Sequence, residues 1–180
     1  MFHEWDNFYL ILGPTAGALI GLLFVVVTLT AGMERASARR GASIFMSPTV
    51  LHFAVVLALS ILVMAPYLTR PMFAALVAVA ALFGFGCAIR VALMIRAGKA
   101  PSPSHWSDVH LYGHLPALIY AVLAVAAAAI ARGLPWGGGL MAASAVALLL
   151  MAIRNSWDLV VWLAGAARTE KPGADVEPAA

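Results

Sequence analysis

Long runs of apolar residues, separated by short breaks, dominate the pattern along the chain. Five such runs cover approximately residues 8–31, 49–69, 72–95, 109–131 and 139–164. A bilayer core about 30 Å thick requires about 20 residues of α-helix, since each residue rises about 1.5 Å. The runs are apolar on every side, as lipid-embedded helices are. The pattern therefore predicts an all-α fold, a polytopic transmembrane helix bundle with five spans that forms a single domain over residues 1–168.

Pro, Gly and charged residues mark the breaks between these runs. The breaks are Gly32–Ser47, the tight Arg70-Pro71 turn, Ala97–Asp108 and Gly133–Gly138. The last segment, Thr169–Ala180, is charged, rich in Pro, Gly and Ala, and lacks an aromatic residue. Such a composition cannot fill an apolar core, so we expect residues 169–180 to form a disordered cytoplasmic tail.

The Lys and Arg residues near the ends of the runs predict the orientation. Five spans place the first and third connections and the C-terminus on one side of the membrane. That side carries seven basic residues and the other carries two: Arg35, Arg39, Arg40, Arg96, Lys99, Arg168 and Lys171 against Arg70 and Arg132. Cytoplasmic loops carry the excess of positive charge. We therefore expect the N-terminus outside and the C-terminus inside, on the cytoplasmic face of the membrane.

Composition narrows the classes of protein and of partner. Of the 180 residues, 63% are hydrophobic and 11% are charged, and the mean hydropathy is +0.95, which excludes a soluble globular domain. The single cysteine, Cys87, excludes a disulfide scaffold. The net charge of +3 comes from basic residues spread over short loops, so it predicts contact with lipid headgroups and not with nucleic acid. Nucleotide-binding and nucleophile motifs are absent from the sequence, which offers no catalytic residues.

A few polar residues lie inside the apolar runs, where a centred charge costs at least about 2.5–3.5 kcal/mol. With the predicted topology, all of them map to the cytoplasmic half of the membrane: His52, Arg90, His114, Arg154, Asn155 and Asp158. One interpretation is an ion-pair and hydrogen-bond network that holds the helices in register. The other is a cytoplasm-facing site or pore for an ion or a small polar solute.

Histidine spacing adds a hypothesis about metal or haem. His110 and His114 are four residues apart, which places two imidazoles on one helix face, as in some metal sites. With His52 they would supply three ligands to a divalent metal, or His52 and His114 could ligate haem b on its two axial sides. The alternative is that His110 lies at the membrane interface and His114 is buried against the fifth run.

Glycines repeat at every fourth position in the first run, at Gly13, Gly17 and Gly21. Small residues at this spacing let a second helix approach closely within lipid. This face is predicted to pack against a neighbouring span or against another subunit.

Several segments resemble a group of small, uncharacterised bacterial integral membrane proteins with about five transmembrane helices. The resemblance lies in residues 5–9, 17–26, 48–53 and 154–158. It implies the fold and no established activity. We expect a homo-oligomeric channel or transporter for a small ion or polar solute. The alternatives are a haem- or metal-binding redox subunit and a non-catalytic accessory subunit of a larger membrane complex.

Overall fold

The computed structural model describes residues 3–30, 36–97 and 109–168, and every regular element within these ranges is helical. The elements in chain order are η1 (His3–Trp5), α1 (Asp6–Thr30), α2 (Ala36–Met64), α3 (Arg70–Arg96), the π-helical turn η2 (His110–His114), α5 (Leu115–Ala131) and α6 (Trp136–Arg168). The all-α prediction is confirmed for these residues. The expected tail, residues 169–180, lies outside them.

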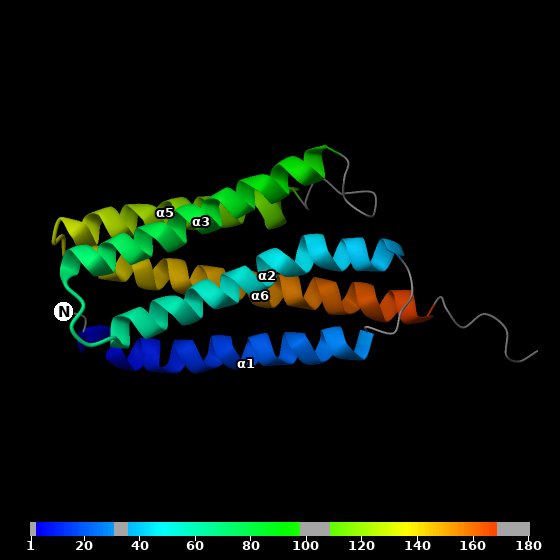
Figure 1. The fold of residues 1–180 in the computed structure, drawn as a ribbon, viewed down its shortest axis with the longest axis horizontal. Helices are drawn as coiled ribbons and strands as arrows, with labels where there is room; N and C mark the ends of the chain where they lie inside the picture. Colours follow the sequence, from blue (N-terminus) through cyan, green and yellow to red (C-terminus); the bar gives the residue numbers. More distant parts are fainter. Residues whose placement is uncertain (1–2, 31–35, 98–108, 169–180) are drawn as a thin grey trace, which may run out of the picture.

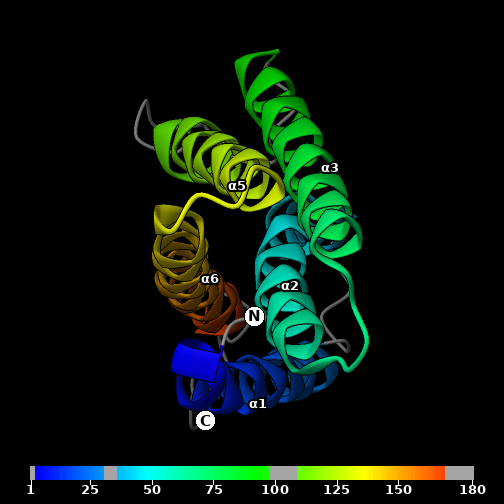
Figure 2. The same ribbon diagram turned by 90° about the vertical axis from the view of Figure 1, so that its left-hand side faces the viewer.

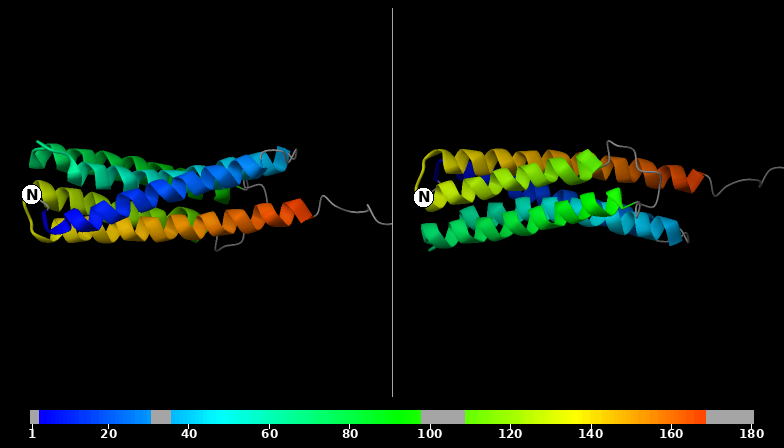
Figure 3. Two further views of the ribbon diagram at one scale, coloured as in Figure 1. Left: turned by 90° about the horizontal axis from the view of Figure 1, so that it is seen from below. Right: turned by 90° about the horizontal axis from the view of Figure 1, so that it is seen from above.

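The long helices run side by side, and the chain passes from one end of the bundle to the other five times (Figure 1). The start of α1 lies at the same end as the connections 65–69 and 132–135. The ends of α1, α3 and α6 lie at the opposite end (Figures 1 and 3). Helices that follow one another in the chain are therefore antiparallel, as short connections require.

Four of the helices form a closed ring. Helix α3 packs against α5, α5 against α6, α6 against α2, and α2 against α3. Helix α1 lies outside this ring, where it packs mainly against α2 and makes a smaller contact with α6 (Figure 2). The ring thus has an interior to which α2, α3, α5 and α6 each present one face.

Helices α3 and α5 pack extensively against each other, and both carry buried small side chains: Ala81, Ala88, Ala126 and Ala127. The outward faces are apolar as well, and large side chains such as Phe83 are mostly exposed. A soluble domain of this size does not leave so many large apolar side chains in water. The surface is that of a protein surrounded by hydrocarbon.

Helix ends differ from the predicted breaks. Helix α2 begins at Ala36 and not near residue 49, because the preceding segment is rich in good helix formers and has no proline before Pro48. It ends at Met64, ahead of Pro66, and Tyr67 then takes a left-handed conformation (φ 64°). Helix α3 starts at Arg70, with its proline in the first turn, where a missing N–H costs nothing.

Helix α6 begins at Trp136, so Gly137, Gly138 and Gly139 are helical. The sequence pattern predicts the first two as part of a break and the third as the start of an apolar run. At Gly137 the reason is packing: an added Cβ would lie 2.9 Å from an Ile130 side-chain carbon and 3.0 Å from the Ile130 backbone nitrogen. The start of α6 can therefore fold back directly on the end of α5.

Four helical segments are long and apolar enough to cross a membrane: Asp6–Val26, Arg70–Arg96, His110–Ala131 and Trp136–Val161. The apolar part of α2, Pro48–Met64, is shorter. Within the described residues the chain thus has the helices of a membrane protein, and α2 contributes the shortest apolar segment.

Candidate functional site

A hydrogen bond between His52 and Tyr120 crosses the interior of the ring. His52 projects from α2 and Tyr120 from α5, at opposite corners of the ring, and the distance from His52 Nδ1 to Tyr120 Oη is 2.9 Å. Both side chains are fully enclosed, with exposed fractions of 1% and 0%. Two helices that share little direct contact are therefore linked by polar side chains in the middle of an apolar bundle.

Helix α3 makes room for this bond at Gly84. A Cβ atom at this position would overlap the aromatic ring of Tyr120. Glycine in a helix interior costs about 1 kcal/mol relative to alanine, so its presence here calls for a packing reason. The reason is that only a residue without a side chain lets the Tyr120 ring lie against α3 and reach His52.

Asn155 supplies the polar group of the fourth helix, α6. Its side chain is 1% exposed, and neither the amide nitrogen nor the amide oxygen has a hydrogen-bond partner among the described residues. The same holds for His52 Nε2. Buried polar atoms are nearly always paired, so three open atoms on two facing helices are an unusual concentration.

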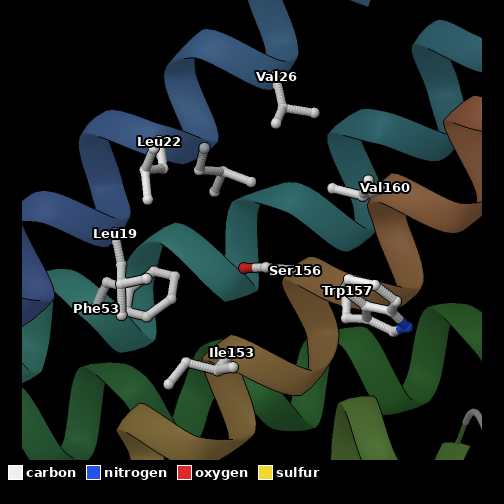
Figure 4. A pocket seen from close by; sticks show the side chains of 9 residues that line it. Leu19, Leu22, Val26, Phe53, Ile153, Ser156, Trp157 and Val160 are labelled. Atoms are coloured by element: carbon white, nitrogen blue, oxygen red, sulfur yellow. The ribbon is translucent and has the colours of Figure 1, made fainter.

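A groove lies on the outside of the bundle, near these two residues in sequence. It runs between α1 and α6 with α2 behind it, and Figure 4 shows side chains from all three helices around it. Phe53 and Ser156, the sequence neighbours of His52 and Asn155, both line this groove. His52 and Asn155 are themselves buried, on two helices in contact, and each adjoins a residue of the groove in sequence.

The bond to Tyr120 decides which proton His52 carries. If the phenol donates to Nδ1, its single proton is used and Nε2 carries the imidazole proton. The opposite tautomer would leave the buried phenol proton without an acceptor in the described part of the chain. His52 therefore presents an N–H donor at Nε2, and the Asn155 amide offers both a donor and an acceptor.

A second polar group lies at the end of the bundle that is remote from the start of α1. Arg96 Nη2 donates to His114 Nε2 at 3.1 Å, because an arginine has no acceptor to offer. The other nitrogen of that ring, His114 Nδ1, then donates to His110 Nδ1 at 3.0 Å. The π-helical turn that holds both histidines approaches α3 closely at Gly113, where an added Cβ would lie 2.6 Å from the Cβ of Ala92.

Arg154 and Asp158 form an ion pair on α6, one helical turn apart. Arg154 Nη2 lies 3.4 Å from Asp158 Oδ2, and the buried Tyr112 donates a hydrogen bond to the same oxygen at 3.3 Å. The two charged side chains are 46% and 40% exposed. The pair therefore lies at the rim of the bundle and not in its interior.

The predicted site residues thus fall into separate places. His52 and Asn155 are buried, Arg154 and Asp158 are partly exposed on α6, His114 bonds to Arg96, and Arg90 is exposed on α3. His52, His110 and His114, the predicted metal ligands, do not form one cluster. Among the described residues, no group of three or more His, Cys, Asp and Glu side chains could hold a metal ion.

The three glycines of the predicted packing face on α1 have different surroundings. Gly13 packs against α2, since an added Cβ would come within 2.9 Å of Ser60 Cβ. Gly17 and Gly21 have open space in the direction of a side chain. Of the three glycines, only Gly13 therefore packs against a neighbouring helix of the same chain, α2.

Sequence reasoning missed Tyr120 and the burial of Tyr9. Tyr120 lies in the middle of an apolar run, and its hydroxyl is a polar group at membrane depth. Tyr9 is 1% exposed and its hydroxyl has no partner among the described residues. Gly84 lies with Gly86 and Cys87 in a patch of small residues that favours close packing, and the group that packs against Gly84 is the Tyr120 ring.

Comparison with models of protein families, with curated proteins and with solved structures finds no match for this chain. Its function must be inferred from the chemistry of its own residues.

Proposed function

We propose that this chain is a five-span protein of the bacterial inner membrane that moves a small ion or polar solute across the bilayer. The polar interior formed by His52, Tyr120 and Asn155 is its solute site. The observation that carries the proposal is the set of three buried atoms without partners, His52 Nε2 and the two amide atoms of Asn155.

These open atoms favour a site over a purely structural network. A buried group without a partner costs about 1–3 kcal/mol, and a network that only holds helices together gains most when every member is satisfied. Alanine or leucine at position 155 would pack the ring without that cost. Polar groups inside a membrane bundle are, for the same reason, functional candidates by default.

The position of α2 supports five spans. This helix lies between α1, α3 and α6, all of which contain segments long and apolar enough to cross a membrane. A helix enclosed in this way has to share the membrane with its neighbours, even though its apolar part is shorter. The excess of Lys and Arg at the end remote from the start of α1 supports the N-terminus outside and the C-terminus in the cytoplasm.

Topology can be tested with single cysteines at exposed positions on opposite ends of the bundle. In a Cys87→Ser background, Leu134→Cys should react with a membrane-impermeant maleimide in intact spheroplasts. Ala97→Cys should react only after permeabilisation. Reversed labelling would overturn the orientation, and labelling of both from one side would overturn the crossing by α5.

Transport can be tested in liposomes with a panel of ions and small polar solutes. His52→Phe and Asn155→Leu should both lower flux strongly. Asn155→Leu should keep or raise thermal stability in detergent, because it removes open polar atoms. His52→Phe should lower it, because the buried Tyr120 hydroxyl loses its partner. Ser156→Ala is the matched control, since the Ser156 hydroxyl is already bonded to Ala152 O at 2.8 Å. Wild-type liposomes that stay tight to the whole panel would refute the proposal.

Homo-oligomer formation remains part of the proposal. Gly17 and Gly21 leave space on α1 for a helix from outside the bundle, which supports association of subunits. Native mass spectrometry from detergent or nanodiscs is the direct test, and a strictly monomeric protein would contradict it.

A second candidate function is haem or metal binding at His52. Histidine ligands commonly have one ring nitrogen held by a hydrogen bond and the other free, which is the state of His52. An absorption spectrum and metal analysis of the purified protein decide this: a Soret band or stoichiometric metal would favour it over transport.

A further inference from the structure

The buried polar side chains of the described residues share one property, which is that none belongs to a permanently charged residue type. They are Thr49, His52, Ser60, Ser144 and Asn155. The described arginines at membrane depth lie elsewhere, Arg90 exposed on α3 and Arg154 at the rim. The ring interior is therefore polar without being charged.

An ion at this level would have no counter-charge. Moving an ion from water into a low-dielectric interior carries an effective penalty that only close opposite charge or a full shell of ligands repays. Asp158, one helical turn from Asn155, already pairs with Arg154, so that turn of α6 contributes no net charge. Asn155 offers a single side-chain oxygen, far short of the oxygen shell that a dehydrated cation requires.

An uncharged solute meets a matching set of groups instead. His52 Nε2 presents one N–H donor, and the Asn155 amide presents N–H donors and one acceptor oxygen. A molecule that carries both an acceptor and a donor, such as a small amide or alcohol, can bond to both residues at once. Tyr120 takes part indirectly, since its bond to Nδ1 keeps the proton on Nε2.

The geometry points to a small uncharged hydrogen-bonding solute as the ligand that His52 and Asn155 bind inside the ring. This inference rests on the proposed transport function and narrows it, because it excludes inorganic ions. It also assigns roles to the two residues: His52 donates to the solute, and Asn155 both donates to it and accepts from it.

The test measures two kinds of flux in the same proteoliposomes. Stopped-flow light scattering follows the entry of urea and of glycerol, and ion-sensitive dyes follow K⁺ and Cl⁻. Wild-type protein should raise urea or glycerol entry above that of protein-free liposomes and leave ion flux unchanged. Asn155→Leu should lower the added solute flux about tenfold, as expected for loss of hydrogen bonds to the solute.

Controls separate misfolding from loss of the site. Ser156→Ala should keep the flux within about twofold of wild type. His52→Phe is measured in parallel with Asn155→Leu, and gel filtration and thermal unfolding are recorded for each, so that one misfolded variant leaves the other to decide.

Each outcome bears on a different statement. Solute flux that depends on Asn155, without ion flux, supports the inference. Ion flux that depends on Asn155 overturns the inference and leaves the proposed transport function standing. Absence of any protein-dependent flux overturns both. Solute flux that neither variant changes overturns the assignment of the site to His52 and Asn155 and leaves transport itself standing.

Discussion

Gly84→Ala is the sharpest test of the interior arrangement. The added methyl group would overlap the Tyr120 ring, so the ring must move away from α3. Because the ring is in the closed interior of the bundle, such a shift separates Tyr120 Oη from His52 Nδ1, which now lie 2.9 Å apart. One methyl group on α3 is thus expected to break a hydrogen bond between two other helices.

The magnitude follows from three contributions. Overpacking a well-filled core costs about 1–3 kcal/mol, and a buried hydrogen bond lost with its partner left in place costs about 1–3 kcal/mol. Alanine gains about 1 kcal/mol over glycine from helix propensity. The substitution should therefore lower the free energy of unfolding by about 1–5 kcal/mol.

Gly86→Ala is the matched control, two residues away on the same helix. A Cβ at Gly86 meets nothing within 4 Å, so only the propensity gain applies and stability should stay level or rise. Both variants are measured by reversible unfolding in mixed detergent micelles, followed by circular dichroism. If Gly84→Ala is as stable as Gly86→Ala, the close contact between α3 and the Tyr120 ring does not exist.

A double-mutant cycle assigns the cost to its causes. Tyr120→Phe removes the hydroxyl and keeps the ring. In that background Gly84→Ala should still lower the free energy of unfolding through overpacking, but no longer through loss of the hydrogen bond. The two substitutions should then be non-additive by about 1–3 kcal/mol. Strict additivity would mean that the ring moves without disturbing His52.

Three further substitutions test other parts of the bundle with the same unfolding assay. Gly113→Ala should cost about 1–3 kcal/mol, because its methyl group would press on Ala92 and separate η2 from α3; unchanged stability would contradict that close approach. Asp158→Asn should cost about 1–3 kcal/mol, since it removes the partner of Arg154 within a span and weakens the bond from Tyr112, and unchanged stability would show that the pair does not hold the fold. Tyr9→Phe should be neutral or raise stability by about 1 kcal/mol, because the buried hydroxyl has no partner among the described residues, and a clear loss would reveal a partner.

The positions of the helices could be predicted from the sequence, whereas their ends could not. Each apolar run marks a stretch that favours hydrocarbon over water, and each lies largely within one helix of the structure. Apolarity says little about where helical hydrogen bonding stops. Helix α2 therefore extends well before its apolar part, and α6 starts among glycines that tight packing against α5 requires.

Part of the candidate site could also be predicted. His52 and Asn155 stand out as polar residues within apolar runs, and both are buried in the ring. Arg90 stands out for the same reason and is exposed, because a helix that is apolar on every side does not reveal which face turns inward. Tyr120 escapes notice because most of its surface is hydrocarbon, although its single hydroxyl sets the tautomer of His52.

The order of the helices in the ring has a consequence for how the protein is made. Helices α1 and α2 are neighbours in the chain and pack together, as are α3 and α5, so each pair can associate as soon as it leaves the ribosome. Helix α6 is synthesised last and packs against both α2 and α5. Until it inserts, His52 and Tyr120 face an open gap in the ring. A chain that ends before α6 would therefore leave these polar side chains without the helix that closes the ring beside them.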